Sequence, residues 1–387
     1  MRAARVEVGD GMLVVGAAVV LVAVALGLRD WYWPPFGVPG GTGFGFLDVR
    51  WFTSAWECVR DGVEVTAANP CDPLERPLSY PRLWLAPAGL GLGQGATVWL
   101  GGGLGIAFLA SAGAVAARLS AWDGVVFAAA LCSPSILLGI ERGNPDLLVF
   151  VLVVAAVLLL RRSARGAAAA HGLLLVAPLL KLYPVLAWGP LLRQPRRRLV
   201  VGLGGISAAF VLYVAVTWDD VRSVQDLAPR DVIFSYGAPI LGDRAGGTLV
   251  VLAAVAAVAA ALVAVARRRP SAVEGRELDL LWAGAGVFVG TFAVAHNYNY
   301  RLAFLLLVLP QLLSWAREER PAVPFARLAL TAVLASLWLG ASLAQLPLGI
   351  GEWWEDVSAG FPYDELVNTL LAGYLAGVLV LTRPRRM

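Results

Sequence analysis

Charged side chains are scarce in this 387-residue chain, and lysine is almost absent. Charged residues make up 15% of the sequence, whereas a soluble domain usually carries about 25%. Lys181 is the single lysine, so every other strongly basic residue is arginine. Hydrophobic residues account for 59% of the chain, largely in long apolar runs. This composition excludes an ordinary soluble domain and predicts an all-α polytopic membrane protein.

Motifs for nucleotide-driven or metal chemistry are also missing. The two histidines and three cysteines show no metal-ligand spacing. No P-loop, GxSxG or dinucleotide-binding motif occurs. We therefore expect neither a cofactor nor a metal. The net charge of +4 does not indicate a nucleic-acid partner, because the cations lie in short loops where they set membrane orientation.

The apolar runs predict about twelve membrane crossings within one integral domain, residues 1–387. A helix needs about 20 apolar residues to cross a bilayer. The two segments around Lys181 are short, and we expect a break at Tyr183-Pro184 because proline removes a helix donor. The expected crossings are 11–29, 94–117, 123–140, 146–160, 167–181, 183–192, 199–216, 246–266, 278–295, 301–315, 324–344 and 365–382.

Arginine clusters occupy roughly every second gap between these runs. Short arginine-rich loops stay in the cytoplasm, which predicts that both termini are cytoplasmic and that the alternate gaps face the exported side. Abundant Ala, Gly and Val beside so much arginine indicate a bacterium with a G+C-rich genome, and therefore a bacterial plasma membrane. The clusters are centred on Arg161, Arg196, Arg267, Arg317 and Arg385.

The first exported loop, about Asp30 to Gly93, is the longest. Its tryptophans predict short interfacial helices that lie at the lipid headgroups. Cys58 and Cys71 both lie in this loop, where an oxidising compartment permits a disulfide. Two free thiols are the alternative, and we expect the bridge. The tryptophans are Trp31, Trp33, Trp51, Trp56 and Trp84.

Asp48 and Lys181 are the first candidates for chemistry. A carboxylate near an apolar, aromatic surface can serve as a general base; alternatively, Asp48 pairs with Arg50 or caps a short helix. Lys181 lies at the outer end of a short span, where ionisable groups are costly and usually functional. Its compact ammonium suits a phosphate, and the alternative is a lysine that extends to the headgroups.

Two polar motifs at the exported side add further candidates. Gly and Pro account for the turn in Glu141–Asp146, but not for its charged and amide side chains, which form either an internal network or a ligand site. His296–Arg301 is the densest polar cluster at a membrane boundary. Its tyrosines fit an aromatic belt, while His296 and Arg301 could donate to an anionic headgroup.

Taken together, these motifs resemble glycosyltransferase family 87, within the GT-C superfamily of polytopic transferases that includes polyprenyl-phosphate-mannose-dependent α-mannosyltransferases. The resemblance lies in Asp48 of the first exported loop, Leu78-Ser79-Tyr80-Pro81, Arg142-Gly143-Asn144-Pro145-Asp146 and Lys181-Leu182-Tyr183-Pro184. The chain departs from the family pattern in two places. Tyr80-Pro81 is followed by Arg82 rather than by a second proline, and the turn does not read Gly-Gln-x-Asn.

The resemblance implies transfer of a sugar, mannose or another hexose or pentose, from a polyprenyl-phosphate donor to a lipid or glycan acceptor at the exported face. Asp48 occupies the place of the family's general base. The resemblance also implies that cations hold the donor phosphate, and we expect Lys181, Arg301, His296 and Arg142 in this role. Further substrate contacts are expected from Asn144, Asp146, Tyr183, Tyr298, Asn299 and Tyr236.

Two other functions fit the same sequence. Transporters and flippases of lipid-linked sugars also contain broken helices and charges at membrane depth, although no convincing inverted repeat is present. A catalytically silent scaffold in an envelope-assembly complex is the third possibility. An enzyme would depend on Asp48, whereas a flippase would depend more on Lys181 and Arg142.

Overall fold

The computed structural model describes residues 10–11, 13–19, 45–227, 235–266, 275–319, 323–339 and 363–384. These residues are mostly helical, and their strands are β1 (Ser235–Tyr236) and β2 (Asn297–Tyr298), which pair antiparallel. The expected all-α class is therefore confirmed for the described part of the chain. The chain divides into two compact units. We call Gly41–Phe108 with Gly139–Asp231 the loop unit, and Met1–Gly40, Leu109–Leu138 and Val232–Met387 the C-terminal unit.

Several helices in the described ranges are long and apolar enough to cross a membrane, which supports a membrane-embedded protein. Five meet this criterion singly, and a pair bent by 57° would supply a sixth. The twelve expected crossings are not confirmed, because other apolar segments form shorter helices or 3₁₀ turns. The five are Gln94–Ala116, Arg196–Val216, Thr248–Val265, Arg276–Val294 and Asp364–Leu381; the bent pair is Ala121–Leu131 with Pro134–Arg142; the shorter helices are Pro145–Leu160, Ala164–Leu180 and Ala326–Trp338.

In the loop unit, the break expected near Lys181 is confirmed. Helix α8 ends at Leu180, Lys181 is extended, and a 3₁₀ helix that contains two prolines begins at Tyr183. Proline cannot donate the hydrogen bond that would continue an α-helix. The elements of this unit are α3 (Leu47–Arg60), η2 (Arg82–Leu90), η3 (Gln94–Ala96), the first part of α4 (Thr97–Ala116), the end of α6 (Pro134–Arg142), α7 (Pro145–Leu160), α8 (Ala164–Leu180), η4 (Tyr183–Arg193), α9 (Arg196–Val216) and α10 (Trp218–Leu227).

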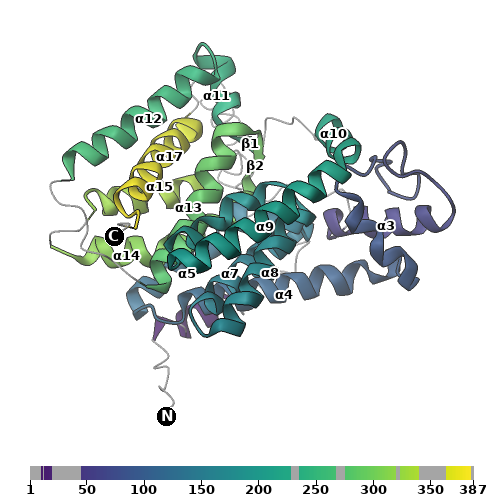
Figure 1. The fold of residues 1–387 in the computed structure, drawn as a ribbon, viewed down its shortest axis with the longest axis horizontal. Helices are drawn as coiled ribbons and strands as arrows, with labels where there is room; N and C mark the ends of the chain where they lie inside the picture. Colours follow the sequence, from purple (N-terminus) through teal and green to yellow (C-terminus); the bar gives the residue numbers. More distant parts are fainter. Residues whose placement is uncertain are drawn as a thin grey trace, which may run out of the picture. The chain divides into compact units, whose positions relative to one another are not determined.

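In the C-terminal unit, α12 and α17 lie side by side (Figure 1). Glycines on α17 allow this close packing: a Cβ at Gly373 would lie 2.6 Å from Val258 Cβ, and one at Gly377 would lie 2.9 Å from Leu262 Cδ2. Small residues four apart are a common packing surface in membranes. The elements are α5 (Ala121–Leu131), α11 (Ala238–Ala245), α12 (Thr248–Val265), α13 (Arg276–Val294), η5 (Asn299–Leu307), α14 (Leu309–Arg317), α15 (Ala326–Trp338) and α17 (Tyr363–Leu381).

The first exported loop has a hydrophobic core of its own. Trp51 and Trp56 are 7% and 5% exposed, so the expectation that they lie at the headgroups is wrong. Their indole N–H groups donate to the carbonyls of Arg76 and Trp84, at 2.9 and 2.5 Å. A buried indole needs such an acceptor, and the loop's own backbone supplies it. Trp31 and Trp33 lie outside the described residues.

The expected Cys58–Cys71 disulfide is present and ties α3 to the segment that follows it. Gln94 holds the same segment, because its side-chain amide donates to the Cys71 carbonyl at 3.1 Å and to Glu57 Oε2 at 3.0 Å. The loop is therefore fixed on α3, the helix that carries Asp48, by one covalent bond and by hydrogen bonds.

We expect the double substitution Cys58→Ser/Cys71→Ser to lower the thermal midpoint of the purified protein. A cross-link that closes a loop of this length contributes about 3 kcal/mol. The measurement is thermal unfolding in detergent, without reductant. Cys132→Ser is the matched control, since Cys132 is a free thiol in the structure. An unchanged midpoint in the double variant would show that the bridge does not stabilise the loop.

Candidate functional site

Asp48 lies in the first turn of α3, where a negative charge is favourable for the helix dipole. The helix begins after Phe46, whose backbone is left-handed and whose N–H donates to the Glu141 carbonyl at 3.0 Å. Asp48 itself is only 2% exposed. A carboxylate this deeply buried requires charged or hydrogen-bonding partners.

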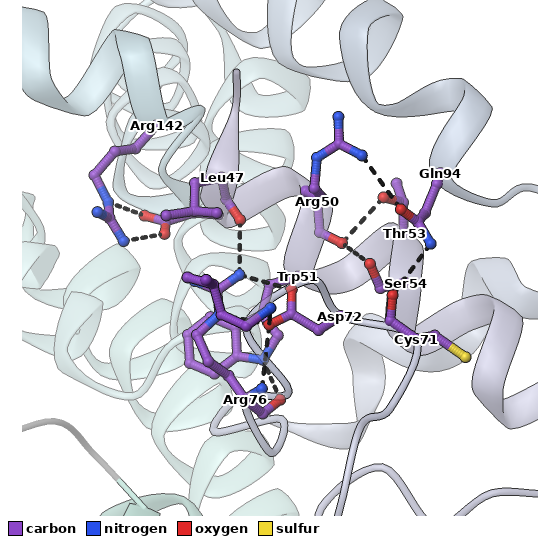
Figure 2. A network of polar contacts seen from close by, with 12 residues as sticks. Leu47, Arg50, Trp51, Thr53, Ser54, Cys71, Asp72, Arg76, Gln94 and Arg142 are labelled. Carbon is purple, nitrogen blue, oxygen red and sulfur yellow. Dashed lines mark hydrogen bonds and ion pairs between the residues drawn. The ribbon is translucent and has the colours of Figure 1, made fainter. Parts of the chain in front are cut away.

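Arg142, at the end of α6, is the main partner of Asp48. Its guanidinium makes a two-point contact, Nη2 to Oδ1 at 2.7 Å and Nε to Oδ2 at 3.1 Å (Figure 2). Such paired geometry is among the stronger ionic contacts in proteins. Arg50, the partner considered from the sequence, instead donates to Gln94 Oε1 at 3.2 Å. Nearness in the sequence therefore did not predict which arginine pairs with Asp48.

The turn after Arg142 packs directly on α3. Gly143 has a φ of 60°, and a Cβ at this position would lie 2.8 Å from Val49 Cγ2. The next residue, Asn144, caps α7: its Oδ1 accepts from the Asp146 N–H at 2.8 Å. Its Nδ2 donates to Asp48 Oδ2 at 2.5 Å. The side chains of the turn thus form an internal network around Asp48.

We expect Gly143→Ala to destabilise this network. The added methyl would be strained at positive φ and would press on Val49. A cost of about 1–3 kcal/mol follows from the backbone strain. The expected result is a lower thermal midpoint than in the control Gly172→Ala, where a Cβ meets nothing within 4 Å. Equal midpoints in the two variants would contradict the proposed docking of the turn.

A second buried ion pair starts from the same turn. Lys181 Nζ lies 2.5 Å from Asp146 Oδ1, and their side chains are 15% and 0% exposed. The ammonium also lies 5.3 Å from the ring centre of Tyr80 and 5.9 Å from that of Tyr183, within cation–π range. Lys181 is therefore held inside the loop unit rather than extended toward headgroups.

Six of the expected site residues thus gather within the loop unit, around the turn between α6 and α7. The negative charges of the two carboxylates are matched by the positive charges of Arg142 and Lys181. Asn144 and Asp146, expected to contact substrate, are both 0% exposed and have internal partners. The six are Asp48, Arg142, Asn144, Asp146, Lys181 and Tyr183.

The other expected residues belong to the C-terminal unit. β1 and β2 pair Tyr236 with Asn297, and Arg301 donates to the Asn297 side chain. Tyr236 is 1% exposed and stacks on Phe288, with ring centres 5.7 Å apart. Tyr298 and Tyr300 stack on each other at 5.3 Å. Asn299 is buried, and His296 is half-buried.

Sequence reasoning missed Arg76 and Asp72, which hold the start of α3 from within the first loop. Arg76 forms an ion pair with Asp72 at 2.7 Å and donates from Nη2 to the Leu47 carbonyl at 3.1 Å. Its guanidinium also lies 4.5 Å from the Trp51 ring centre (Figure 2). The four-residue spacing of Asp72 and Arg76 was the available signal. The contact with Leu47 had none.

The exit from the first loop is tied to α10. Arg82 Nε lies 2.7 Å from Asp220 Oδ1, and this hydrogen bond raises the pKa of Arg82. Arg82 stands where the resembled family usually has a second proline, and the structure gives it a partner within the loop unit.

Comparison with protein-family models, curated proteins and solved structures found no match to this chain. Within the described ranges, no group of three or more His, Cys, Asp or Glu side chains could hold a metal ion.

Proposed function

We propose that this chain is a membrane glycosyltransferase that moves a sugar from a polyprenyl-phosphate donor to a lipid or glycan acceptor at the exported face of a bacterial plasma membrane. The observation that supports this most directly is that residues of one turn hold both groups: Arg142 and Asn144 bind the buried carboxylate of Asp48, and Asp146 pairs with the ammonium of Lys181, whose side chain is 15% exposed. Transfer from a phosphate leaving group is accelerated by a positioned base for the attacking hydroxyl and by a cation beside the departing phosphate.

Asp48 is the proposed general base. The O–H bond of the acceptor hydroxyl breaks and its proton goes to the Asp48 carboxylate. The hydroxyl oxygen forms a bond to the anomeric carbon, and the bond from that carbon to the phosphate oxygen breaks. Its electron pair leaves with the polyprenyl phosphate. Because Asp48 is 2% exposed, the acceptor reaches it only when covering side chains move, so the transfer includes a local rearrangement.

One oxygen of Asp48 has capacity for this proton. Oδ2 accepts from both Arg142 Nε and Asn144 Nδ2, whereas Oδ1 accepts from Arg142 Nη2. A carboxylate oxygen has two lone pairs. We therefore assign the proton to Oδ1. Arg142 orients the carboxylate and is also a proposed contact of the donor phosphate.

Lys181 is the proposed cation that stabilises the departing phosphate. Asp146 neutralises it before the donor binds, so the phosphate must compete with this carboxylate. Tyr183 flanks the ammonium and is proposed to contact the substrate. In the C-terminal unit, His296 and Arg301 are proposed to donate to an anionic headgroup, and Tyr236, Tyr298 and Asn299 to contact substrate.

The test is sugar transfer in membranes that over-produce the protein, supplied with a radiolabelled polyprenyl-phosphate hexose. New labelled glycolipid or glycan, compared with membranes without the protein, is the expected result. Proteoliposomes that contain the protein and the same donor distinguish the transferase from a flippase of lipid-linked sugars. Movement of intact donor between leaflets, without any new product, would identify a flippase and would overturn the transferase proposal.

A further inference from the structure

Asn144 joins the two ion pairs at the turn between α6 and α7. Its Nδ2 donates to Asp48 Oδ2 at 2.5 Å, and its Oδ1 accepts from the Asp146 N–H at 2.8 Å. One rigid amide therefore contacts the carboxylate of the proposed base on one side. On the other, it contacts the backbone of the residue whose side chain holds Lys181.

Its burial separates this arrangement from an ordinary helix cap. Asn144 is 0% exposed, whereas Ser163, the cap of α8, lies at the surface. Capping α7 requires only the side-chain oxygen of Asn144, Oδ1, and the side-chain oxygen of serine or aspartate would serve as well. The Nδ2 group is not needed for the cap, and Asp48 is the acceptor that it contacts in the described part of the chain.

The direction of this hydrogen bond has a consequence for the reaction. Arg142 contacts both oxygens of the carboxylate, through Nη2 to Oδ1 and Nε to Oδ2, and so already limits its rotation. A second donor on Oδ2 resists this rotation and occupies that oxygen's remaining acceptor position. Oδ1 is then the oxygen that remains to take the proton from the hydroxyl group of the sugar acceptor.

We propose that Asn144 is a positioning residue: its amide fixes the rotation of Asp48 so that Oδ1 accepts the proton, and it holds the base at a set place relative to the Lys181–Asp146 pair. This inference rests on the proposed function, since it takes Asp48 as the base. Asn144 itself contacts no reacting atom, and this role replaces the substrate contact expected from the sequence.

Asn144→Ser tests the proposal, because serine keeps the cap and loses the donor to Asp48. We expect a modest fall in the thermal midpoint, because the buried hydrogen bond to Asp48 is lost while the cap remains. We expect kcat to fall roughly 10- to 100-fold, the range for loss of one hydrogen bond to a charged group, with an unchanged KM for the donor. Asn144→Asp also keeps the cap and places a second carboxylate beside Asp48, so its kcat should fall further.

Ser163→Ala is the matched control, because it removes the cap that accepts from the Gly166 N–H at 2.9 Å without touching this turn. It should lower the thermal midpoint slightly and leave kcat unchanged. A role for Asn144 as a helix cap alone predicts wild-type kcat in Asn144→Ser. That result, in a protein whose wild type is active, would overturn the positioning role and leave the transferase proposal standing.

A double-mutant cycle gives a readout that does not depend on catalysis. We expect Asn144→Ser to shift the thermal midpoint less in an Asp48→Ala background than in the wild type, because the partner of Nδ2 has already been removed. Equal shifts would show that the two side chains are not coupled and would overturn the proposal. If the wild type transfers no sugar, the proposed function fails, while the cycle still decides whether Asn144 holds Asp48.

Discussion

Asp48→Asn is expected to reduce sugar transfer by about 10²- to 10⁴-fold, the contribution of a positioned general base. Asparagine has nearly the shape of aspartate, and its carbonyl oxygen can still accept from Arg142 or Asn144. It cannot take the proton of the acceptor hydroxyl. The measurement is initial rate at saturating donor, with protein levels matched and binding of the donor determined separately. We expect donor binding to be retained.

Asp61→Asn is the control for this experiment. Asp61 follows the last residue of α3 and is exposed, so the same chemical change there should leave transfer unaffected. Because Asp48→Asn also removes the carboxylate that pairs with Arg142, its thermal midpoint must be measured beside its rate. A folded Asp48→Asn variant that transfers sugar at the wild-type rate would remove Asp48 from the mechanism and show that it only holds α3 to α6.

The class of fold could be predicted because lipid imposes a simple requirement. A helix in a bilayer must satisfy its backbone polar groups internally and present apolar side chains, which leaves long hydrophobic runs in the sequence. The break at Tyr183-Pro184 could also be predicted, because proline lacks the backbone N–H that continues a helix, and this effect is local to its own position. The count of crossings could not. Apolar segments such as η4 and η5 satisfy the composition of a span, but form 3₁₀ helices instead.

The aromatic residues of the first loop show a different limit. Tryptophan is suited to a headgroup layer and to a protein core, because its ring is apolar and its N–H is polar. Only the presence of a nearby acceptor decides between them. For Trp51 this acceptor is the Arg76 carbonyl, 25 residues away, and no local pattern places it there.

The site was predictable as a set of residues and not as a set of pairs. Rare charged and amide side chains at membrane boundaries are costly, which made Asp48, Arg142 and Lys181 candidates. Their partners depend on tertiary packing. Asp48 is paired across 94 residues with Arg142 rather than with neighbouring Arg50, because Gly143 lets the turn lie against α3. The amide of Asn144 likewise faces inward toward Asp48.

Lys181→Met is expected to be the most destabilising substitution in the loop unit. Methionine keeps the length and apolar stem of lysine but removes the ammonium that pairs with the Asp146 carboxylate, which is 0% exposed. Removing one partner of a buried ion pair costs about 3–5 kcal/mol. The measurement is thermal or denaturant unfolding in detergent. Arg82→Met is the control, because Arg82 pairs with Asp220 at the surface, with side chains 50% and 26% exposed, and such pairs contribute about 1 kcal/mol or less.

The double variant Lys181→Met/Asp146→Asn separates the stability of this pair from its proposed role in the reaction. It removes both charges, so we expect most of the lost stability to return, as is common when a buried pair is replaced by neutral side chains. The Asp146 N–H still donates to Asn144, which preserves the cap of α7. If Lys181 holds the departing phosphate, the double variant will still transfer sugar slowly and require more donor, although its stability has recovered. If it recovers wild-type transfer, Lys181 serves the fold alone, and the cation for the phosphate must come from other residues.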